Sequence, residues 1–440
     1  MSKNRSISRR RLVSTIGASV AAGLAGCSDS SDRSEATNTS GKEGGSNSTT
    51  QGERLNVASW GGDVESDIVT SILEDYDSSN PNVNVKYQNI PFGEYSTKLK
   101  TQFSGGTEPE VFYLASGSAP QYMQNSALLA LDSYVENSDN YAYDDILDNL
   151  LSAFQYQGKT YGIPKDFTPV GLFMNESHLE EAGANTSPET WSGFRSALEA
   201  VKTSTDVEYP FAFGSRPRNT LVQLIWQNGG RILSEDNSEC VVGSTAAIEA
   251  LQYLLDLRSD GLAAIYGNEI SPTWAAPSLG KERVTAAMTG AWSISTLKEE
   301  YGSVSDSLKV ANPMPIPNGG QQSTIVFTTS WSASAQQETK QASAALVKSL
   351  TSKEGMWKWT KTGTALPARR SLLEKDFYDD RPLLNGLGNL ADDGRPFLFG
   401  IHHSEVVDTV MSEVEGAVTG AKSPDAALKD AERQLNSDVF

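Results

Sequence analysis

Beyond about residue 53, segments in which apolar and polar residues alternate are separated by segments whose apolar residues recur at helical spacing. Alternation is typical of a half-buried strand, and a short continuous apolar run is typical of a fully buried one. The strands predicted in this way cover residues 55–59, 83–87 and 110–114. Helices are expected between them, the first with Asp63 as its N-cap and the second over 94–103. The apolar stripe of the first helix consists of Val64, Ile68, Ile72 and Tyr76.

This order of strand, helix, strand, helix and strand predicts right-handed crossovers and a largely parallel sheet, and therefore an α/β fold. Ligands bind such sheets beyond the carboxyl ends of the strands. Two segments occupy that position, residues 60–63 and 115–118. We therefore expect part of a binding cleft at these two segments.

The later part of the chain continues the mixture. Residues 161–164 and 170–174 are expected to be extended, and the proline-rich stretch 312–317 is expected to be a connector, because proline fits neither a helix interior nor a central strand. The helices predicted from apolar spacing cover residues 191–202, 246–258, 339–350 and 404–418.

Charge and size restrict the classes of function. The 440 residues include 55 Asp and Glu against 36 Lys and Arg, a formal net charge of −19, which argues against binding to nucleic acid. A single core stops growing at roughly 250–300 residues, so two lobes are expected. With two cysteines and three histidines (His178, His402 and His403), neither a metal site nor a cofactor is predicted.

The first 27 residues have the features of an export signal. Residues 8–13 carry consecutive arginines followed by two apolar residues, which fits the twin-arginine pattern, and residues 12–25 are mildly hydrophobic. The sequence Leu-Ala-Gly-Cys at 24–27 resembles a lipobox, in which Cys27 would carry lipid. The alternative is an ordinary cysteine in an apolar helix. Residues 28–52 are polar and are expected to form a disordered tether.

Several weak motifs occur together, in order, over residues 55–437. They are YGIPKD at 161–166, LFMN at 172–175, EAG at 181–183, PETW at 188–191, QNGG at 227–230, AMTGAW at 287–292, TGTALPAR at 362–369 and DAALKDA at 425–431. This series resembles the family 1 extracellular solute-binding proteins, the binding subunits of ABC importers, which include maltose-binding protein. The acidic composition and the twin-arginine lipoprotein signal resemble haloarchaeal members of that family.

The resemblance implies a type II periplasmic-binding-protein-like clam of two lobes with a ligand cleft at the hinge. One lobe would comprise about 53–165 and 313–365, and the other about 168–311 and 370–440, within a binding domain at 53–440. The lobe connectors would be residues 164–168, 312–317 and 364–368. Departures from the family pattern at Glu110, Met174 and 328–331 leave the identity of the sugar open.

Sugar recognition needs aromatic faces against the ring and polar groups for its hydroxyls. The candidate ligand-binding residues are Trp60, Asp63, Ser116, Ser118, Asp166, Thr168, Trp274, Trp292 and Trp331. The remaining tryptophans, Trp191, Trp226, Trp357 and Trp359, are interpreted as core residues. Arg216 and Arg218 either clamp an anionic ligand or pair with surface carboxylates, and the second interpretation is favoured.

The resulting hypothesis is a lipid-anchored protein on the outer face of the cell membrane. As a monomer and without catalysis, it would capture a sugar or oligosaccharide and deliver it to an ABC permease. Two alternatives remain open. The ligand could be another solute, such as glycerol phosphate or a polyamine, or the protein could be an extracellular glycoside hydrolase. No nucleophile-elbow, zinc-protease or phosphate-loop motif is present in the sequence.

Overall fold

The computed structural model describes residues 52–136, 141–271 and 273–440. The predicted export signal, Cys27 and nearly all of the predicted tether lie outside the described residues. In the described part, no helix combines the length and apolarity that a membrane span requires.

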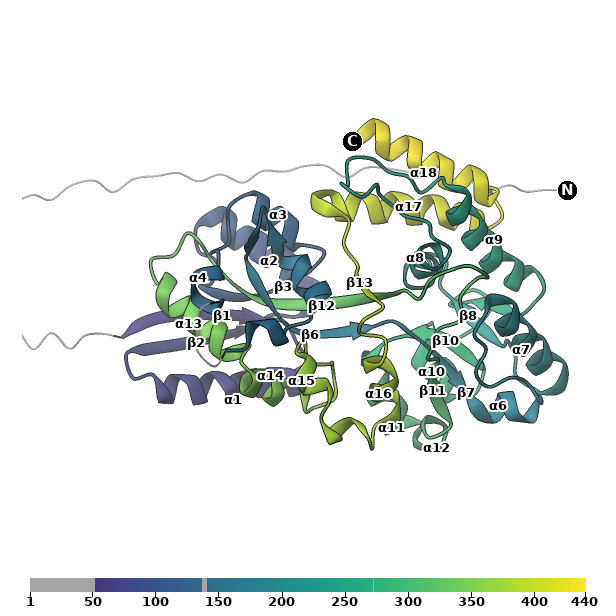
Figure 1. Cartoon of the computed structure of the whole chain (residues 1–440), viewed down its shortest axis with the longest axis horizontal. Helices are drawn as coiled ribbons and strands as arrows, with labels where there is room; N and C mark the ends of the chain where they lie inside the picture. The colour runs from purple at the N-terminus through teal and green to yellow at the C-terminus, as the bar shows by residue number, and fades with distance from the viewer. Residues whose placement is uncertain (1–51, 137–140, 272) are drawn as a thin grey trace, which may run out of the picture. The chain divides into compact units, whose positions relative to one another are not determined.

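Two sheets organise the described residues (Figure 1). The first has the strand order β13-β12-β3-β1-β2, with β6 also paired to β12. Its strands are β1 (Glu53–Ser59), β2 (Val83–Asn89), β3 (Val111–Ala115), β6 (Gly162–Pro169), β12 (Thr324–Ala333) and β13 (Gly394–Pro396). The second has the order β11-β7-β10-β8-β9. Its strands are β7 (Gly171–Asn175), β8 (Phe211–Phe213), β9 (Ala263–Ile265), β10 (Ala286–Thr289) and β11 (Leu308–Val310). A small hairpin pairs β4 (Gln155–Tyr156) with β5 (Lys159–Thr160).

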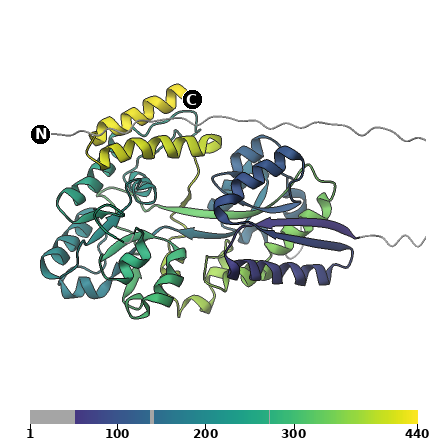
Figure 2. The ribbon, with the colours of Figure 1, turned by 180° about the vertical axis from the view of Figure 1, so that it is seen from behind.

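Helices cover both sheets (Figures 1 and 2). Those that precede β7 in the chain are α1 (Asp63–Ser79), α2 (Phe92–Gly105), α3 (Ala119–Gln124), α4 (Asp132–Val135) and α5 (Asp148–Leu151). Between β7 and β12 lie α6 (Glu176–Glu181), α7 (Trp191–Ser204), α8 (Arg218–Gln227), α9 (Thr245–Ser259), α10 (Ala275–Gly280), α11 (Ile294–Glu300) and α12 (Gly302–Ser305). After β12 come α13 (Lys340–Leu350), α14 (Lys353–Thr360), α15 (Arg370–Leu373), α16 (Pro382–Gly388), α17 (His403–Val418) and α18 (Pro424–Asp438).

Each sheet has its own hydrophobic core. The first core gathers β1, β3, α13 and Trp359 of α14. The second gathers β7, β8, β9 and the buried faces of α7, α8, α9, α17 and α18. The strand β12 contributes to both cores, because Ile325 and Val326 belong to the second and Trp331 and Ala333 to the first.

Within the first sheet, the strands β6 and β12 lie side by side, form an antiparallel ladder and extend toward the second sheet (Figures 1 and 2). The ladder is interrupted once. Thr329 is opposite Asp166, but the next residue, Ser330, is opposite Pro164, so Lys165 has no partner across the ladder. This irregularity is a β-bulge, and bulges commonly redirect side chains next to functional sites.

The structure corrects three expectations. The first sheet is mixed rather than largely parallel, because β12 runs antiparallel to β3. Asp63 is the first residue of α1 and does not cap it; Gly62 is the N-cap, and its N–H donates to Glu65 Oε2 at 3.0 Å. This contact is half of a capping box and needs no side chain at the cap. Of the predicted stripe of α1, only Val64 is wrong, because it is 69% exposed; Ile68, Ile72 and Tyr76 are half-buried against the first core, beside the buried Val69 and Leu73.

The remaining predicted elements are confirmed within a few residues. The helices predicted over 191–202, 246–258, 339–350 and 404–418 are α7, α9, α13 and α17. The three predicted strands are β1, β2 and β3.

Candidate functional site

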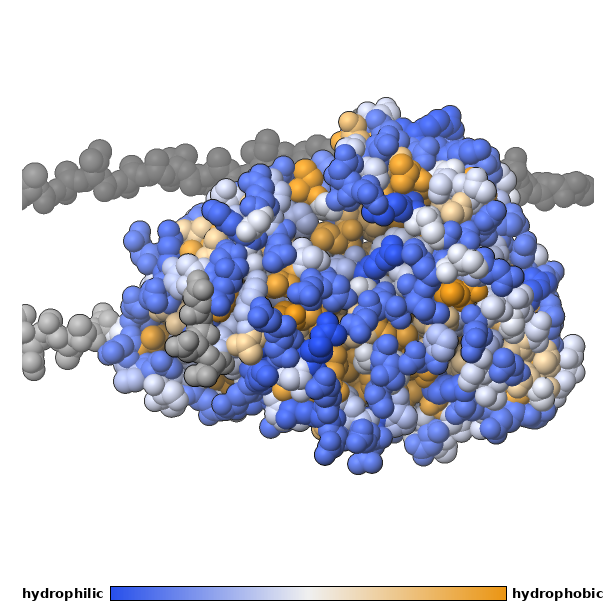
Figure 3. Space-filling view, viewed as in Figure 1, coloured by the Kyte–Doolittle hydropathy of each residue, from blue (hydrophilic) through white to orange (hydrophobic). Residues whose placement is uncertain are grey.

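The candidate site is a cleft of about 700 Å³ between the two cores, called here the main cleft. Its lining residues are Trp60, Glu65, Phe92, Tyr113, Ala115, Ser116, Gly117, Ser118, Lys165, Asp166, Thr168, Arg218, Asn219, Trp292, Phe327, Thr328, Thr329, Trp359, Thr364, Ala365, Phe397 and His403. Figure 3 shows that hydrophilic residues dominate one face of the protein and that hydrophobic residues gather in its recessed middle. A cleft of this size is in the range of small-molecule sites.

Aromatic rings from both cores line the main cleft. On the side of the first core, Trp60 meets Tyr113 edge-on at 5.1 Å between ring centroids, and Phe92 at 5.8 Å. On the side of the second core, Trp292 is 40% exposed and meets Phe327 edge-on at 5.9 Å. These edge-on packings hold the rings while leaving ring surface toward the cleft, which suits contact with the C–H faces of a sugar.

An ion pair lies at the bulge between the two cores. The Lys165 ammonium contacts the Asp166 carboxylate, and its Nζ lies 3.8 Å from the ring centroid of Trp359 and 4.4 Å from that of Tyr113. Asp166 Oδ2 also accepts a hydrogen bond of 2.8 Å from Trp359 Nε1. Burial lowers the pKa of Lys165, and the charge of Asp166 opposes this shift.

The Asp166 backbone is also fixed, because Thr328 Oγ1 donates to the Asp166 carbonyl at 2.7 Å. The carboxylate is therefore held at the floor of the main cleft by β6, β12 and α14 together. Rigid positioning of this kind lets a polar group select the orientation of a ligand hydroxyl.

His403 also lines the main cleft. Its ring stacks on Phe399 at 5.7 Å and meets Phe397 edge-on at 5.2 Å. Burial, reinforced by the positive charge of Arg218, lowers the pKa of His403 to about 4, so the imidazole is neutral at pH 7. A Cβ on Gly117 would lie 2.7 Å from His403 Nε2, so this position of the ring requires glycine at 117.

Six of the nine candidate ligand-binding residues line the main cleft. They are Trp60, Ser116, Ser118, Asp166, Thr168 and Trp292. Trp274 instead lines a neighbouring chamber. Trp331 and Asp63 lie outside both: Trp331 is 3% exposed and packs edge-on against Tyr113 at 4.3 Å, and the exposed Asp63 starts α1. Ligand contact by the six lining residues stays a prediction.

Several lining residues were not predicted from the sequence. Trp359 was interpreted as a core residue and is indeed buried, but it also borders the main cleft. Of the two arginines, Arg216 pairs with Asp408 at 3.4 Å, as the surface interpretation expected, whereas Arg218 lines the cleft. Within the described ranges, no group of three or more His, Cys, Asp and Glu side chains is placed to hold a metal ion.

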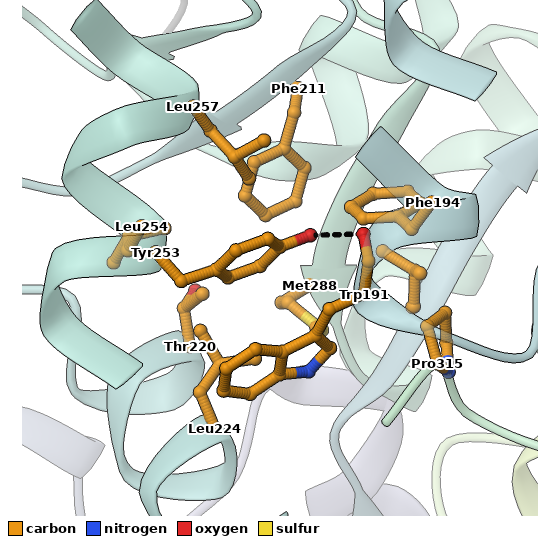
Figure 4. Close-up of a pocket in the computed structure, with 11 residues that line it drawn as sticks. Trp191, Phe194, Phe211, Thr220, Leu224, Tyr253, Leu254, Leu257, Met288 and Pro315 are labelled. Carbon is orange, nitrogen blue, oxygen red and sulfur yellow. Dashed lines mark hydrogen bonds between the residues drawn. The ribbon is translucent and has the colours of Figure 1, made fainter. Parts of the chain in front are cut away.

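A second, much smaller cavity belongs to the second core. It measures about 20 Å³, and its lining is almost entirely apolar (Figure 4). Trp191 stacks on Tyr253 at 4.5 Å, and the Tyr253 hydroxyl donates to the Trp191 carbonyl at 2.9 Å. This cavity has room for about one water molecule, so it is a packing defect and not a ligand site.

A family model covers most of the chain. The sequence model described as bacterial extracellular solute-binding protein matches residues 71–386. A curated binding protein of Brucella abortus (strain 2308) is 22% identical over 361 residues, which is 81% of this chain and 86% of that protein.

Solved structures share the fold. The sugar-binding protein MalE from Xanthomonas citri superposes with a TM-score of 0.79 at 21% identity, over 87% of this chain and 96% of that one. The GacH receptor of Streptomyces glaucescens superposes with a TM-score of 0.74 at 23% identity, over 88% of this chain and 100% of that one. The cyclic α-maltosyl-1,6-maltose binding protein from Arthrobacter globiformis superposes with a TM-score of 0.76 at 20% identity, over 88% of this chain and 98% of that one. The described residues therefore have the two-lobe fold of these solute-binding proteins.

Proposed function

Because the chain belongs to the bacterial extracellular solute-binding proteins, we propose that it is the membrane-anchored binding subunit of an ABC importer. It captures a sugar or oligosaccharide in the main cleft and delivers it to a permease. Two solved relatives support the ligand class, since one is described in complex with acarbose and another as a binding protein for a cyclic maltosaccharide. We expect a monomer that needs no cofactor.

One observation carries the proposal: aromatic faces from both lobes border the same cleft. Trp60 lies at the end of β1 in the first lobe, and Trp292 lies after β10 in the second. A ring bound between them contacts both lobes at once, so the closed state gains more contact with the ligand than the open state. A ligand shifts the equilibrium between the open and the closed state by the difference between its affinities for the two states. No covalent bond changes in this mechanism.

We extend the proposal to the division of the chain. The first lobe comprises about 53–165 and 313–365, and the second about 168–311 and 370–440. For most of the chain the two cores support this division, with β6 and β12 as connections between them, but Met314, Ile325 and Val326 pack in the second core.

Truncating the cleft tryptophans tests the ligand site. If a partial contact of about 80 Å² is lost, Trp292→Ala or Trp60→Ala should cost about 2 kcal/mol of binding, or roughly thirtyfold in affinity. Trp191→Ala is the matched control, because its ring packs in the second core on Tyr253. This control should instead lose about 3–5 kcal/mol of stability.

The measurements are calorimetric titration with a panel of neutral oligosaccharides and unfolding without ligand. Parental affinity in both cleft variants would refute the site. Analysis of the recovered sugar distinguishes the two classes of function, because a binding protein returns it intact and a glycoside hydrolase cleaves it.

The anchor is proposed from the sequence alone and has its own test. Cys27→Ser should release the protein into the medium or leave it unprocessed, because the lipid attached to this residue would be the anchor. Cell fractionation and the mass of the mature chain measure both outcomes. A processed Cys27→Ser protein that remains with the membrane would refute lipid attachment at this residue.

A further inference from the structure

A side chamber of about 220 Å³ adjoins the main cleft on the second lobe. It shares Arg218, Asn219 and Trp292 with the main cleft. The residues that line the side chamber and not the main cleft include Arg216, Tyr266 and Trp274. The shared residues make the chamber a branch of the proposed binding site, so one ligand can occupy both.

Two buried polar atoms of the side chamber have no hydrogen-bond partner in the described part of the protein. They are the side-chain oxygen of Asn219 and the hydroxyl of Tyr266. Buried polar atoms in folded proteins are nearly always satisfied, and an unsatisfied pair at one cavity points to water or a ligand that completes them. A tyrosine hydroxyl is a donor for an anionic oxygen, and an amide can pair with a sugar hydroxyl.

The charge of the side chamber is positive in a strongly acidic protein. Arg216 is already engaged, since it donates to the Asp408 carbonyl at 2.9 Å and pairs with the Asp408 carboxylate. Among the residues that the structure describes, no carboxylate lies within 4.0 Å of the Arg218 guanidinium to form an ion pair. Arg218 is also the first residue of α8, where the helix dipole adds positive potential. In the main cleft, by contrast, Lys165 is neutralised by Asp166.

We propose that the side chamber binds an anionic substituent of the ligand, so that the captured solute is an acidic saccharide. A carboxylate, sulfate or phosphate on the sugar lies against Arg218, which presents parallel N–H donors that match such groups, and accepts a hydrogen bond from Tyr266. The sugar ring covers Trp292 at the junction with the main cleft. This inference rests on the proposed function and specifies its substrate class.

The test compares acidic sugars with partners that differ only in charge. The probes are oligosaccharides that end in a glucuronate, galacturonate or mannuronate, the methyl ester of each, and the corresponding 6-sulfated and 6-phosphorylated chains. Affinities are measured by calorimetry at constant ionic strength. The parent protein should bind one acidic form about tenfold to a hundredfold more tightly than its uncharged partner, the range expected for a charge-assisted hydrogen bond. The preferred probe identifies the anionic group.

Arg218→Gln should bring the ratio of the affinities for the acidic and the uncharged probe close to one. Tyr266→Phe should reduce it by a smaller factor. Arg370→Gln is the matched control, because it removes the same charge from an exposed pair with Asp392 outside both cavities and should leave the ratio intact. The inference is overturned if the parent binds the acidic and the uncharged probe with nearly equal affinity. It is also overturned if Arg218→Gln retains the parental ratio of affinities, or if Arg370→Gln loses that ratio to the same extent as Arg218→Gln. Tight binding of neutral sugars alone overturns it and leaves the proposed function standing, whereas failure of every saccharide to bind removes both.

Discussion

Replacing Asp166 by asparagine would leave the Lys165 ammonium buried without its counter-ion. Lys165 is 4% exposed, and its surroundings are the rings of Trp359 and Tyr113. Asparagine has the size of aspartate and can still accept the hydrogen bond from Trp359 Nε1. The substitution therefore removes charge while it retains shape.

The expected loss of unfolding free energy is large, although the substitution only replaces one carboxylate oxygen by an amide nitrogen. Removing one partner of a buried ion pair costs about 3–5 kcal/mol, and cation–π attraction from two rings offsets part of this cost. We expect Asp166→Asn to lose about 3 kcal/mol of unfolding free energy at pH 7. Replacing both partners, as Lys165→Met with Asp166→Asn, should recover most of the loss, because no unpaired charge is then buried. Asp260→Asn is the control, since its pair with Arg195 is partly exposed and should contribute at most about 1 kcal/mol.

Urea unfolding at two pH values tests independently whether the unpaired Lys165 charge causes the loss of stability in Asp166→Asn. Burial lowers the pKa of Lys165 even beside Asp166, so its pKa in Asp166→Asn should be lower still. The unfolded chain keeps the lysine proton up to about pH 10.4, whereas the folded variant releases it earlier. Stability rises with pH wherever the unfolded state binds more protons, so the deficit of the variant should shrink between pH 7 and about pH 9.5.

The reasoning fails if Asp166→Asn unfolds within about 1 kcal/mol of the parent at pH 7, or if its deficit is equal at both pH values. It also fails if the double variant is as unstable as the single one. A loss below about 1 kcal/mol would mean that water, and not Asp166, compensates the Lys165 charge, whereas an equally unstable double variant would mean that the unpaired charge is not the cause of the loss.

Two further outcomes are expected. In the unfolded chain, His403 is protonated below about pH 6.5, but in the folded protein it is protonated only near pH 4. The unfolding free energy should therefore fall by up to about 3 kcal/mol as the pH drops through this window. His403→Gln should flatten this part of the curve of urea midpoint against pH, and an unchanged curve would contradict the assignment. The net charge of −19 predicts self-repulsion at low ionic strength, so the melting temperature should rise between about 0.05 and about 2 M NaCl. A melting temperature independent of salt would contradict this expectation.

The sequence predicted the elements whose polarity pattern is periodic. The helices α7, α9, α13 and α17 each have a buried face and an exposed one, and their apolar spacing reflects that difference. The strand β3 was recognised instead as a short apolar run, and its residues 111–114 are all buried. Helix α8 has no such signal, because residues 220–227 are all buried and therefore lack a polar face. Its first two residues, Arg218 and Asn219, could not be placed at the cleft for the same reason.

The contacts that complete the site come from distant parts of the chain. The carboxyl ends of β1 and β3 were recognised, and Trp60, Ser116 and Ser118, which follow these strands, line the main cleft. No local pattern could show that β12 inserts antiparallel beside β3, so the first sheet was expected to be largely parallel and Trp331 was expected to face the ligand. His403 reaches Gly117 from nearly 300 residues away, through tertiary packing alone.

The ladder between β6 and β12 has a mechanical consequence for the two lobes. Two antiparallel strands joined by hydrogen bonds form a ribbon that resists stretching and sliding, because either movement breaks several ladder bonds together. Such a ribbon bends most readily out of its own plane, and it is weakest at the bulge, where Lys165 has no partner. A ligand hydroxyl that engages Asp166 would therefore contact the ribbon beside its bulge, at the point where the ladder is interrupted.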